Sequence, residues 1–147
     1  MVGLGHVVYY VHDLQCSLRF YEQAVGLSIK GTIFNGRAAL LSGGRTHHEL
    51  LLIEVGDAPG PLTGKRAGLY HVGWKVGESL DELREVKQRL ESLGYSADAM
   101  SDHTISYSLY LRDPDGNEVE LYVDNMEFDW QSDDSWMQAP VKPLSIQ

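Results

Sequence analysis

Apolar and polar residues alternate with a period of two in several short segments of the chain and follow a helical period in two longer segments. Residues 3–11 are rich in β-branched and aromatic side chains and predict a strand. A helix is expected next, between a capping Asp13 and a terminating Gly26. Its apolar positions recur at helical spacing: Leu14, Leu18, Tyr21 and Val25. Three further strands are predicted at residues 27–34, 37–43 and 48–55.

The same order of elements begins again after a loop at residues 56–67. A strand is predicted at residues 68–76, a helix from a Ser79 cap to Gly94, extended runs near Ala97 and at residues 105–111, and a last strand at residues 118–123. The apolar positions of this helix are Leu83, Val86, Leu90 and Leu93. The segments GLGHVVYYV and GLYHVGWKV share five residues in the same places, which pairs His6 with His71. The sequence therefore predicts an α+β fold of paired βαβββ modules in one domain, with modules at residues 1–56 and 68–124 and a tail at 125–147.

The hairpin near the end of the second module contains a carboxylate whose surroundings need an explanation. Two alternating runs flank the turn sequence DPDGN, and Glu120 lies between Val119 and Leu121 in the second run. Carboxylates are almost never fully buried unless they are paired or bound to a metal. Glu120 therefore either points to solvent or binds a cation, and strand parity alone does not decide between the two because Glu118, Glu120 and Tyr122 share one face.

The repeat adds two histidines at equivalent positions of equivalent strands. A single strand histidine is more often a core or surface residue than a ligand, but His6, His71 and Glu120 together supply two imidazoles and one carboxylate. This donor set suits Fe(II) and leaves about three coordination positions open. Iron bound in this way retains one positive charge, which favours an anionic, chelating substrate.

Composition narrows the classes of partner. The 147 residues carry a net charge of −9, with 43% hydrophobic residues, which indicates a folded protein and disfavours nucleic acid or an anionic membrane surface as the main partner. No apolar run approaches the roughly 20 residues of a membrane helix, and the N-terminus has no signal pattern, so a cytoplasmic location is expected. The single cysteine, Cys16, excludes an internal disulfide and is expected to be a buried thiol. A homodimer is expected from the general frequency of such assemblies.

Two motifs carry a resemblance to a known family. The opening GLGHVVYYVHDLQCSLRFYEQAVGL and the ending DPDGNEVELY resemble the vicinal oxygen chelate superfamily, which includes glyoxalases, fosfomycin-inactivating transferases, bleomycin-binding proteins and type I extradiol dioxygenases. The resemblance covers the whole chain and implies a curved mixed sheet of paired modules around a metal site. Both motifs are shared across the superfamily, so they are specific for the fold and not for the activity.

Within the superfamily the ring-cleaving dioxygenases look closest. Their ligand pattern carries over onto His6, His71 and Glu120, and their acid/base histidine, in a His-His pair at the start of an apolar strand, matches His48. Their strand tyrosine matches Tyr110, and a pocket histidine upstream of it resembles His103. The resemblance implies an Fe(II) enzyme that cleaves a catechol-like aromatic diol with dioxygen. A histidine with an ordinary pKa of about 6.5 can accept and return the substrate's proton. The larger extradiol enzymes contain two module pairs per chain, whereas this chain has one.

Other interpretations stay open at this point. His48 is also compatible with a turn residue at a strand start, and Tyr110 with an ordinary strand aromatic. A glyoxalase-type isomerase or thiol transferase would use Mn, Ni or Zn. The glyoxalase pattern requires a fourth metal ligand at the position of Leu51, and Glu49 lies two residues away. A third possibility is a metal-free protein of the bleomycin-resistance type that binds an aromatic ligand between subunits. The tail contains Phe128, Trp130 and Trp136, which are expected to pack on the body or on a partner chain.

Overall fold

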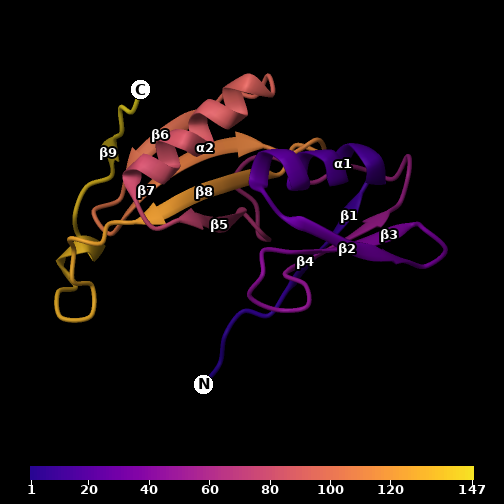
Figure 1. Cartoon of the computed structure of the whole chain (residues 1–147), viewed down its shortest axis with the longest axis horizontal. Coiled ribbons are helices and arrows are strands. Elements are labelled where there is room, and N and C mark those ends of the chain that lie inside the picture. Colours follow the sequence, from indigo (N-terminus) through magenta and orange to yellow (C-terminus); the bar gives the residue numbers. More distant parts are fainter. The chain divides into compact units, whose positions relative to one another are not determined.

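The computed structural model describes residues 1–147 and divides into two compact units. The first unit contains residues 1–67 together with 113–117, and the second contains residues 68–112 and 118–147. Each unit has one mixed sheet and one α-helix, which confirms the predicted pair of βαβββ modules (Figure 1). The five-residue turn between the last two strands of the second module groups with the first unit, a placement that the sequence pattern does not predict. None of the helices has the length and apolar character needed to cross a membrane.

The first unit forms a four-stranded sheet in the order β1-β4-β3-β2. Its elements are β1 (Val7–Val11), α1 (Leu14–Phe20), the π-helical turn η1 (Tyr21–Val25), β2 (Ser28–Ile33), β3 (Ala38–Ser42) and β4 (Leu50–Glu54). β1 runs parallel to β4, and the other pairs are antiparallel. The Asp13 carboxylate accepts a hydrogen bond from the backbone N–H of Cys16 and so caps α1. Gly26 ends the helical segment with φ +99°, a backbone conformation that favours glycine.

Helix α1 packs against β3 and β4 and covers one face of the first sheet. The four apolar helix positions predicted from the sequence are all buried: Leu14, Leu18, Tyr21 and Val25. They meet a buried sheet surface that includes Leu50 and Leu52. The expectation for Cys16 is wrong, because this residue is exposed. It lies two residues after Leu14, on the side of the helix that faces away from the sheet.

The second unit repeats this order and adds one short strand, giving β5-β8-β7-β6-β9. Its elements are β5 (His71–Gly77), α2 (Leu80–Ser92), β6 (Ala99–Asp102), β7 (Ser106–Arg112), β8 (Glu118–Asp124), the 3-10 turn η2 (Ser135–Met137) and β9 (Lys142–Pro143). The Ser79 hydroxyl caps α2, as predicted. Leu83, Val86 and Leu90 are buried, whereas Leu93 is 40% exposed because it is the C-cap residue, where the helix ends.

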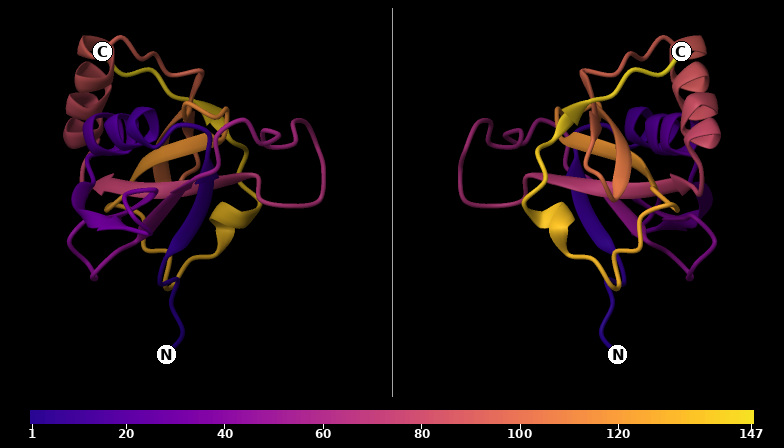
Figure 2. Two further views of the ribbon diagram at one scale, coloured as in Figure 1. Left: turned by 90° about the vertical axis from the view of Figure 1, so that its right-hand side faces the viewer. Right: turned by 90° about the vertical axis from the view of Figure 1, so that its left-hand side faces the viewer.

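The C-terminal tail follows the edge of the second sheet. β9 pairs with β6 in antiparallel fashion, and the segment after it, yellow in Figure 2, ends with the side chain of Ile146 buried. Trp130 is 62% exposed and so does not pack on the body, whereas Phe128 and Trp136 are half-buried; packing of the tail on a partner chain stays a prediction.

Side chains of β8 alternate strictly between two environments, which positions the candidate site. Val119, Leu121 and Val123 are fully buried in the layer between the sheet and α2, which contacts β5, β7 and β8. The intervening residues Glu118 and Glu120 therefore point to the opposite face of the sheet. The shared face predicted from strand parity is confirmed.

Candidate metal centre

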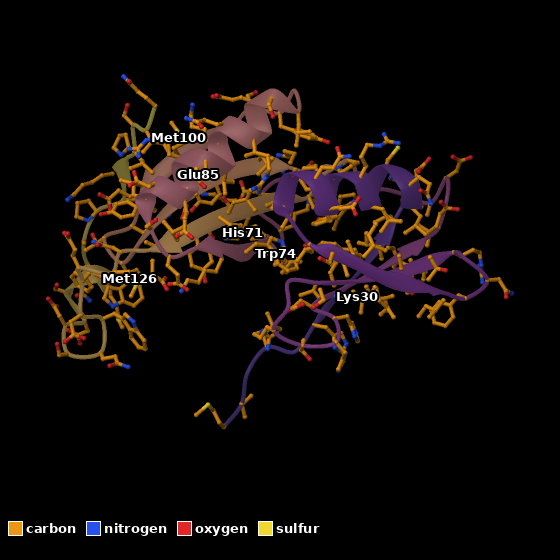
Figure 3. The ribbon with its side chains drawn as sticks, viewed as in Figure 1. Lys30, His71, Trp74, Glu85, Met100 and Met126 are labelled. Carbon is orange, nitrogen blue, oxygen red and sulfur yellow. The ribbon has the colours of Figure 1, made fainter.

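His71, labelled in Figure 3, is the first residue of β5. Its imidazole lies between two carboxylates of the neighbouring parallel strand β8. Its backbone is in register with Glu118, and Gly73 is in register with Glu120. The imidazole Nδ1 is 2.8 Å from Glu118 Oε2, and the imidazole Nε2 is 3.1 Å from Glu120 Oε2. Both carboxylates are largely shielded, with side chains only 16% and 15% exposed. The two nitrogens of one histidine thus each face a different carboxylate.

The second oxygen of Glu120 is held by two hydroxyl groups from β7. Ser108 Oγ donates to Glu120 Oε1 over 2.6 Å, and the Tyr110 hydroxyl donates to the same oxygen over 3.0 Å. His103 Nε2 lies 2.6 Å from the Tyr110 hydroxyl, which completes a chain from His103 through Tyr110 to Glu120. Because Oε1 is occupied in this way, Oε2 is the Glu120 oxygen that is directed at His71.

Burial raises the pKa of the Tyr110 phenol, and the negative charge of Glu120 raises it further. The phenol therefore stays protonated at neutral pH and remains a hydrogen-bond donor. In the structure it donates to Glu120 and accepts from His103, so it helps to fix the carboxylate.

The turn between β6 and β7 holds His103 in place. Thr104 adopts φ +74°, an unusual value for a residue with a branched side chain. Asp102 Oδ1 accepts from the Thr104 N–H at 2.8 Å, and Asn125 Nδ2 donates to the Thr104 carbonyl at 2.9 Å. Asp102 thus stabilises the turn that carries His103.

Electrostatics and geometry at His71 fit a divalent cation. When Nδ1 carries the proton that bonds to Glu118, the Nε2 lone pair faces a lone pair of Glu120, and the contact is repulsive unless a proton or a cation lies between them. Two donor atoms each about 2.1 Å from one metal ion, at right angles, lie about 3.0 Å apart. The Nε2–Oε2 separation of 3.1 Å matches this spacing.

Gly73 keeps the space beside this pair open. A Cβ atom at this position would lie 3.1 Å from Glu120 Oε2 and 3.4 Å from a ring carbon of Tyr122. A side chain here would crowd the carboxylate oxygen that faces His71, so the glycine inside β5 has a local steric reason.

The first unit brings His6, His47 and His48 together. His6 precedes β1 and is exposed, and its ring centroid is 4.7 Å from that of His48. His47 Nδ1 and His48 Nδ1 are 2.6 Å apart. Desolvation lowers the pKa of His48, and the neighbouring His47 and His6 lower it further. His48 is therefore neutral at physiological pH, the form that can accept a proton.

The strand register of the two units shows which residues correspond to the carboxylates of β8. Val8 pairs with Leu51 in the first unit as Gly73 pairs with Glu120 in the second, so Leu51 is the counterpart of Glu120. By the same register Glu49 corresponds to Glu118. The Glu49 carboxylate accepts hydrogen bonds from the backbone N–H groups of Gly43 and Arg45 and does not bond to His6.

The structure therefore groups the residues predicted from sequence into two sets. His71, Glu120, Tyr110 and His103 come together in the second unit, and His6 contacts His48 in the first. No group of three or more His, Cys, Asp or Glu side chains is arranged to hold a metal ion, so the predicted triad of His6, His71 and Glu120 stays a prediction.

Three residues that were not predicted as site residues contribute to the site: Glu118, Ser108 and Gly73. A glycine inside a strand is a recognised sign of close approach by another group, so Gly73 offered a signal. Glu118 shares a strand face with Glu120, but its bond to His71 depends on the register between β5 and β8, which the sequence does not give.

Comparison with known families identifies the fold family. Residues 3–121 match the model of the Glyoxalase/Bleomycin resistance protein/Dioxygenase superfamily. The chain belongs to this superfamily. The resemblance inferred from its two motifs is confirmed. A glyoxalase/dioxygenase from Nostoc punctiforme shares the fold, with a TM-score of 0.72 at 17% sequence identity. This match covers 83% of the present chain and 90% of the other.

Two relatives from bacteria indicate the range of activities. The chain is 33% identical to a catechol-2,3-dioxygenase of Bacillus subtilis over 88% of its own length and 44% of the relative. It spans about half the length of the first curated relatives that it matches. It is also 30% identical to a probable trivalent organoarsenical cleaving enzyme of Bacillus subtilis, over 96% of this chain and 93% of the relative.

Proposed function

We propose that this member of the superfamily is a non-haem Fe(II) extradiol dioxygenase that cleaves a catechol-like aromatic diol. The observation that supports it best is the pair formed by His71 Nε2 and Glu120 Oε2, held 3.1 Å apart beside Gly73. With His6 as the third ligand, the pair would make up the facial triad that suits Fe(II) and leaves positions open. The similarity to a catechol-2,3-dioxygenase supports the choice of reaction.

The register of the first sheet favours this activity over that of a glyoxalase. A glyoxalase-type centre requires a fourth metal ligand at the first-unit position that corresponds to Glu120. The apolar Leu51 occupies that position. Glu49, the other candidate, already accepts from two backbone N–H groups and lies 3.8 Å from the Arg45 guanidinium. Recruiting Glu49 to a metal would break these contacts, so a three-ligand site accounts better for the residues present.

The protein residues around the metal would handle protons and hold the substrate. Bound iron would supply a template on which diol and dioxygen bind side by side. The neutral imidazole of His48 would accept a proton from the diol and return it later in the reaction. When substrate binds, the Tyr110 phenol, kept protonated by its raised pKa, would shift its hydrogen bond from Glu120 to a substrate oxygen, and His103 would fix the phenol through the 2.6 Å contact.

Dioxygen uptake tests the proposal directly. Protein loaded anaerobically with Fe(II) is mixed with a panel of catechols, while uptake and the yellow ring-opened product are recorded. One dioxygen consumed per diol, with that product, is the expected result. Glu120→Ala should lose both iron and uptake, whereas Asp124→Asn, on the same strand face, should keep both. Iron-loaded protein that consumes no dioxygen with any catechol would refute the dioxygenase.

A second candidate substrate follows from the relative that matches nearly the full length of the chain. A trivalent organoarsenical is soft and prefers thiolate ligands, and the only thiol here is the exposed Cys16. Adding a trivalent aryl arsenical to the same uptake panel separates the candidates. Dioxygen uptake with the arsenical, and with none of the catechols, would assign the arsenical as the substrate. If Cys16→Ser then lost this uptake, the Cys16 thiol would be assigned to arsenical binding.

A further inference from the structure

We propose that Glu118 is a positioning residue that fixes the tautomer of His71, so that Nδ1 carries the proton and Nε2 is presented as the metal-binding atom. The inference rests on the proposed metal centre and names a residue that acts on it through His71. The bond that carries the inference, between His71 and Glu118, appears only in the folded second unit.

The geometry allows one assignment of the ring proton when a metal binds. Nδ1 is 2.8 Å from Glu118 Oε2, a normal charge-assisted hydrogen-bond length. An ionised carboxylate can only accept, so Nδ1 must donate. In a neutral imidazole the other nitrogen then has a free lone pair, and this nitrogen, Nε2, is the one directed at Glu120 Oε2.

Packing holds Glu118 and His71 in this arrangement. The two residues are directly paired in the parallel register of β5 and β8, so their side chains leave the same sheet face at the same level. Their side chains are 16% and 28% exposed, so water competes poorly for the bond. The Tyr70 ring lies edge-on against His71 at a centroid distance of 4.7 Å.

The first unit provides an internal comparison. Glu49 occupies the position that corresponds to Glu118, yet its carboxylate is used by the backbone of Gly43 and Arg45. His6 therefore has no equivalent carboxylate partner there and instead contacts His48. A glutamate at this position of the repeat does not bond to the histidine by default, so the Glu118–His71 bond is a specific feature of the second unit.

Removing the hydrogen-bond partner of a metal-binding histidine typically weakens metal affinity about 10- to 100-fold. The experiment compares Glu118→Leu with Glu118→Gln in the full-length protein, using Zn(II) as a redox-silent probe in competition with a chromophoric chelator. Leucine removes the acceptor, whereas glutamine keeps a neutral acceptor oxygen. We expect the leucine variant to bind Zn(II) about 10- to 100-fold more weakly and the glutamine variant to stay close to wild type. Asp124→Asn removes a charge from the same strand face and should also stay close to wild type.

Each alternative gives a different pattern. Equal losses in Glu118→Gln and Glu118→Leu would mean that the carboxylate acts by charge or binds the metal itself, and either result overturns the positioning role. Wild-type affinity in both variants overturns it as well. Wild-type protein that binds neither Zn(II) nor Fe(II) would refute the metal centre of the proposed function and the inference with it.

A measurement on the wild-type protein covers the case in which Glu118→Leu does not fold. In the Zn(II)-loaded protein labelled with ¹⁵N-histidine, His71 should show a proton on Nδ1 that exchanges slowly with water and a metal-shifted Nε2. A His71 that carries its proton on Nε2 in the loaded protein would overturn the proposal.

Discussion

The Tyr21 hydroxyl donates a hydrogen bond of 2.7 Å to Asp113 Oδ2, joining the helical segment of the first unit to the DPDGN turn. Both residues are buried, and 92 positions separate them in the chain. Asp113 also accepts from the Asn117 side chain and from the backbone of Asp115 and Asn117. The turn predicted from sequence is thus the anchor that groups residues 113–117 with the first unit.

Tyr21→Phe should destabilise the protein. A hydrogen bond to a charged group is typically worth about 1.5–3 kcal/mol, and its loss leaves one lone pair of a buried carboxylate unsatisfied. The free energy of unfolding, measured by urea denaturation at pH 7, should fall by about that amount. A variant as stable as wild type would show that water replaces the phenol at no cost.

Tyr9→Phe is the matched comparison for Tyr21→Phe, and it should not lower the free energy of unfolding. The Tyr9 hydroxyl is buried and has no hydrogen-bond partner among the protein atoms, and its pKa is raised to about 12 by desolvation and by the charge of Asp113. Removing an unsatisfied buried hydroxyl should leave the free energy of unfolding unchanged or raise it by about 1 kcal/mol. A loss comparable to that of Tyr21→Phe would mean that the hydroxyl has a bound water as partner.

His12 should make stability depend on pH. Its Nε2 lies 2.6 Å from the Ala58 carbonyl and its Nδ1 2.5 Å from Asp115 Oδ1, so both nitrogens face acceptors. The hydrogen bond to Ala58 and then that to Asp115 raise the pKa of His12, with the charges of Asp115 and Asp57 adding to the effect. Because the folded-state pKa is above the unfolded value of about 6.5, the stabilisation is complete below that pH and is lost as pH rises through the folded-state pKa.

The test compares urea midpoints of wild type and His12→Gln at pH 5.5 and at pH 9. The variant should be less stable than wild type at the lower pH, and the gap should narrow at the higher pH. In an Asp115→Asn background the pH dependence of this gap should shrink. A gap that widens with pH would contradict the assignment of a charged His12.

His48→Phe should keep the metal and lose turnover. If His48 is the base, kcat for ring cleavage should fall about a hundredfold or more, with iron content unchanged, since a general base typically contributes that much. His47→Phe is the matched control, because His47 is the exposed neighbour of His48. It should retain most of the turnover. Equal losses in both variants would remove the assigned role from His48.

Gly73→Ala should weaken metal binding without unfolding the protein. The added Cβ would lie 3.1 Å from Glu120 Oε2 and so push away the oxygen proposed to bind the metal. A rise in the Zn(II) dissociation constant at an unchanged urea midpoint is expected. Gly3→Ala, which meets nothing within 4 Å, should change neither quantity. An unchanged Zn(II) affinity in Gly73→Ala would argue against metal binding through this oxygen.

The helices and strands and their repetition follow from local patterns in the amino-acid sequence. Hydrophobic spacing, the caps at Asp13 and Ser79 and the stop at Gly26 are local signals, and each acts within a few residues, so the helices appear where they are predicted. The duplicated strands paired His6 with His71. Strand parity likewise placed Glu118 and Glu120 on one face.

Which side chains meet at the site depends on how the strands pair in the folded sheet. The contacts of His71 with Glu118 and Glu120, and of Glu120 with Ser108, depend on pairing between strands that are separate in the chain. A shift of a single residue in that register would turn these side chains to the other face of the sheet. The exposure of Cys16, the turn that Tyr21 anchors and the space beside Gly73 are also products of packing. Local patterns fix the elements because their causes are local, whereas a site depends on distances that only the assembled sheet sets.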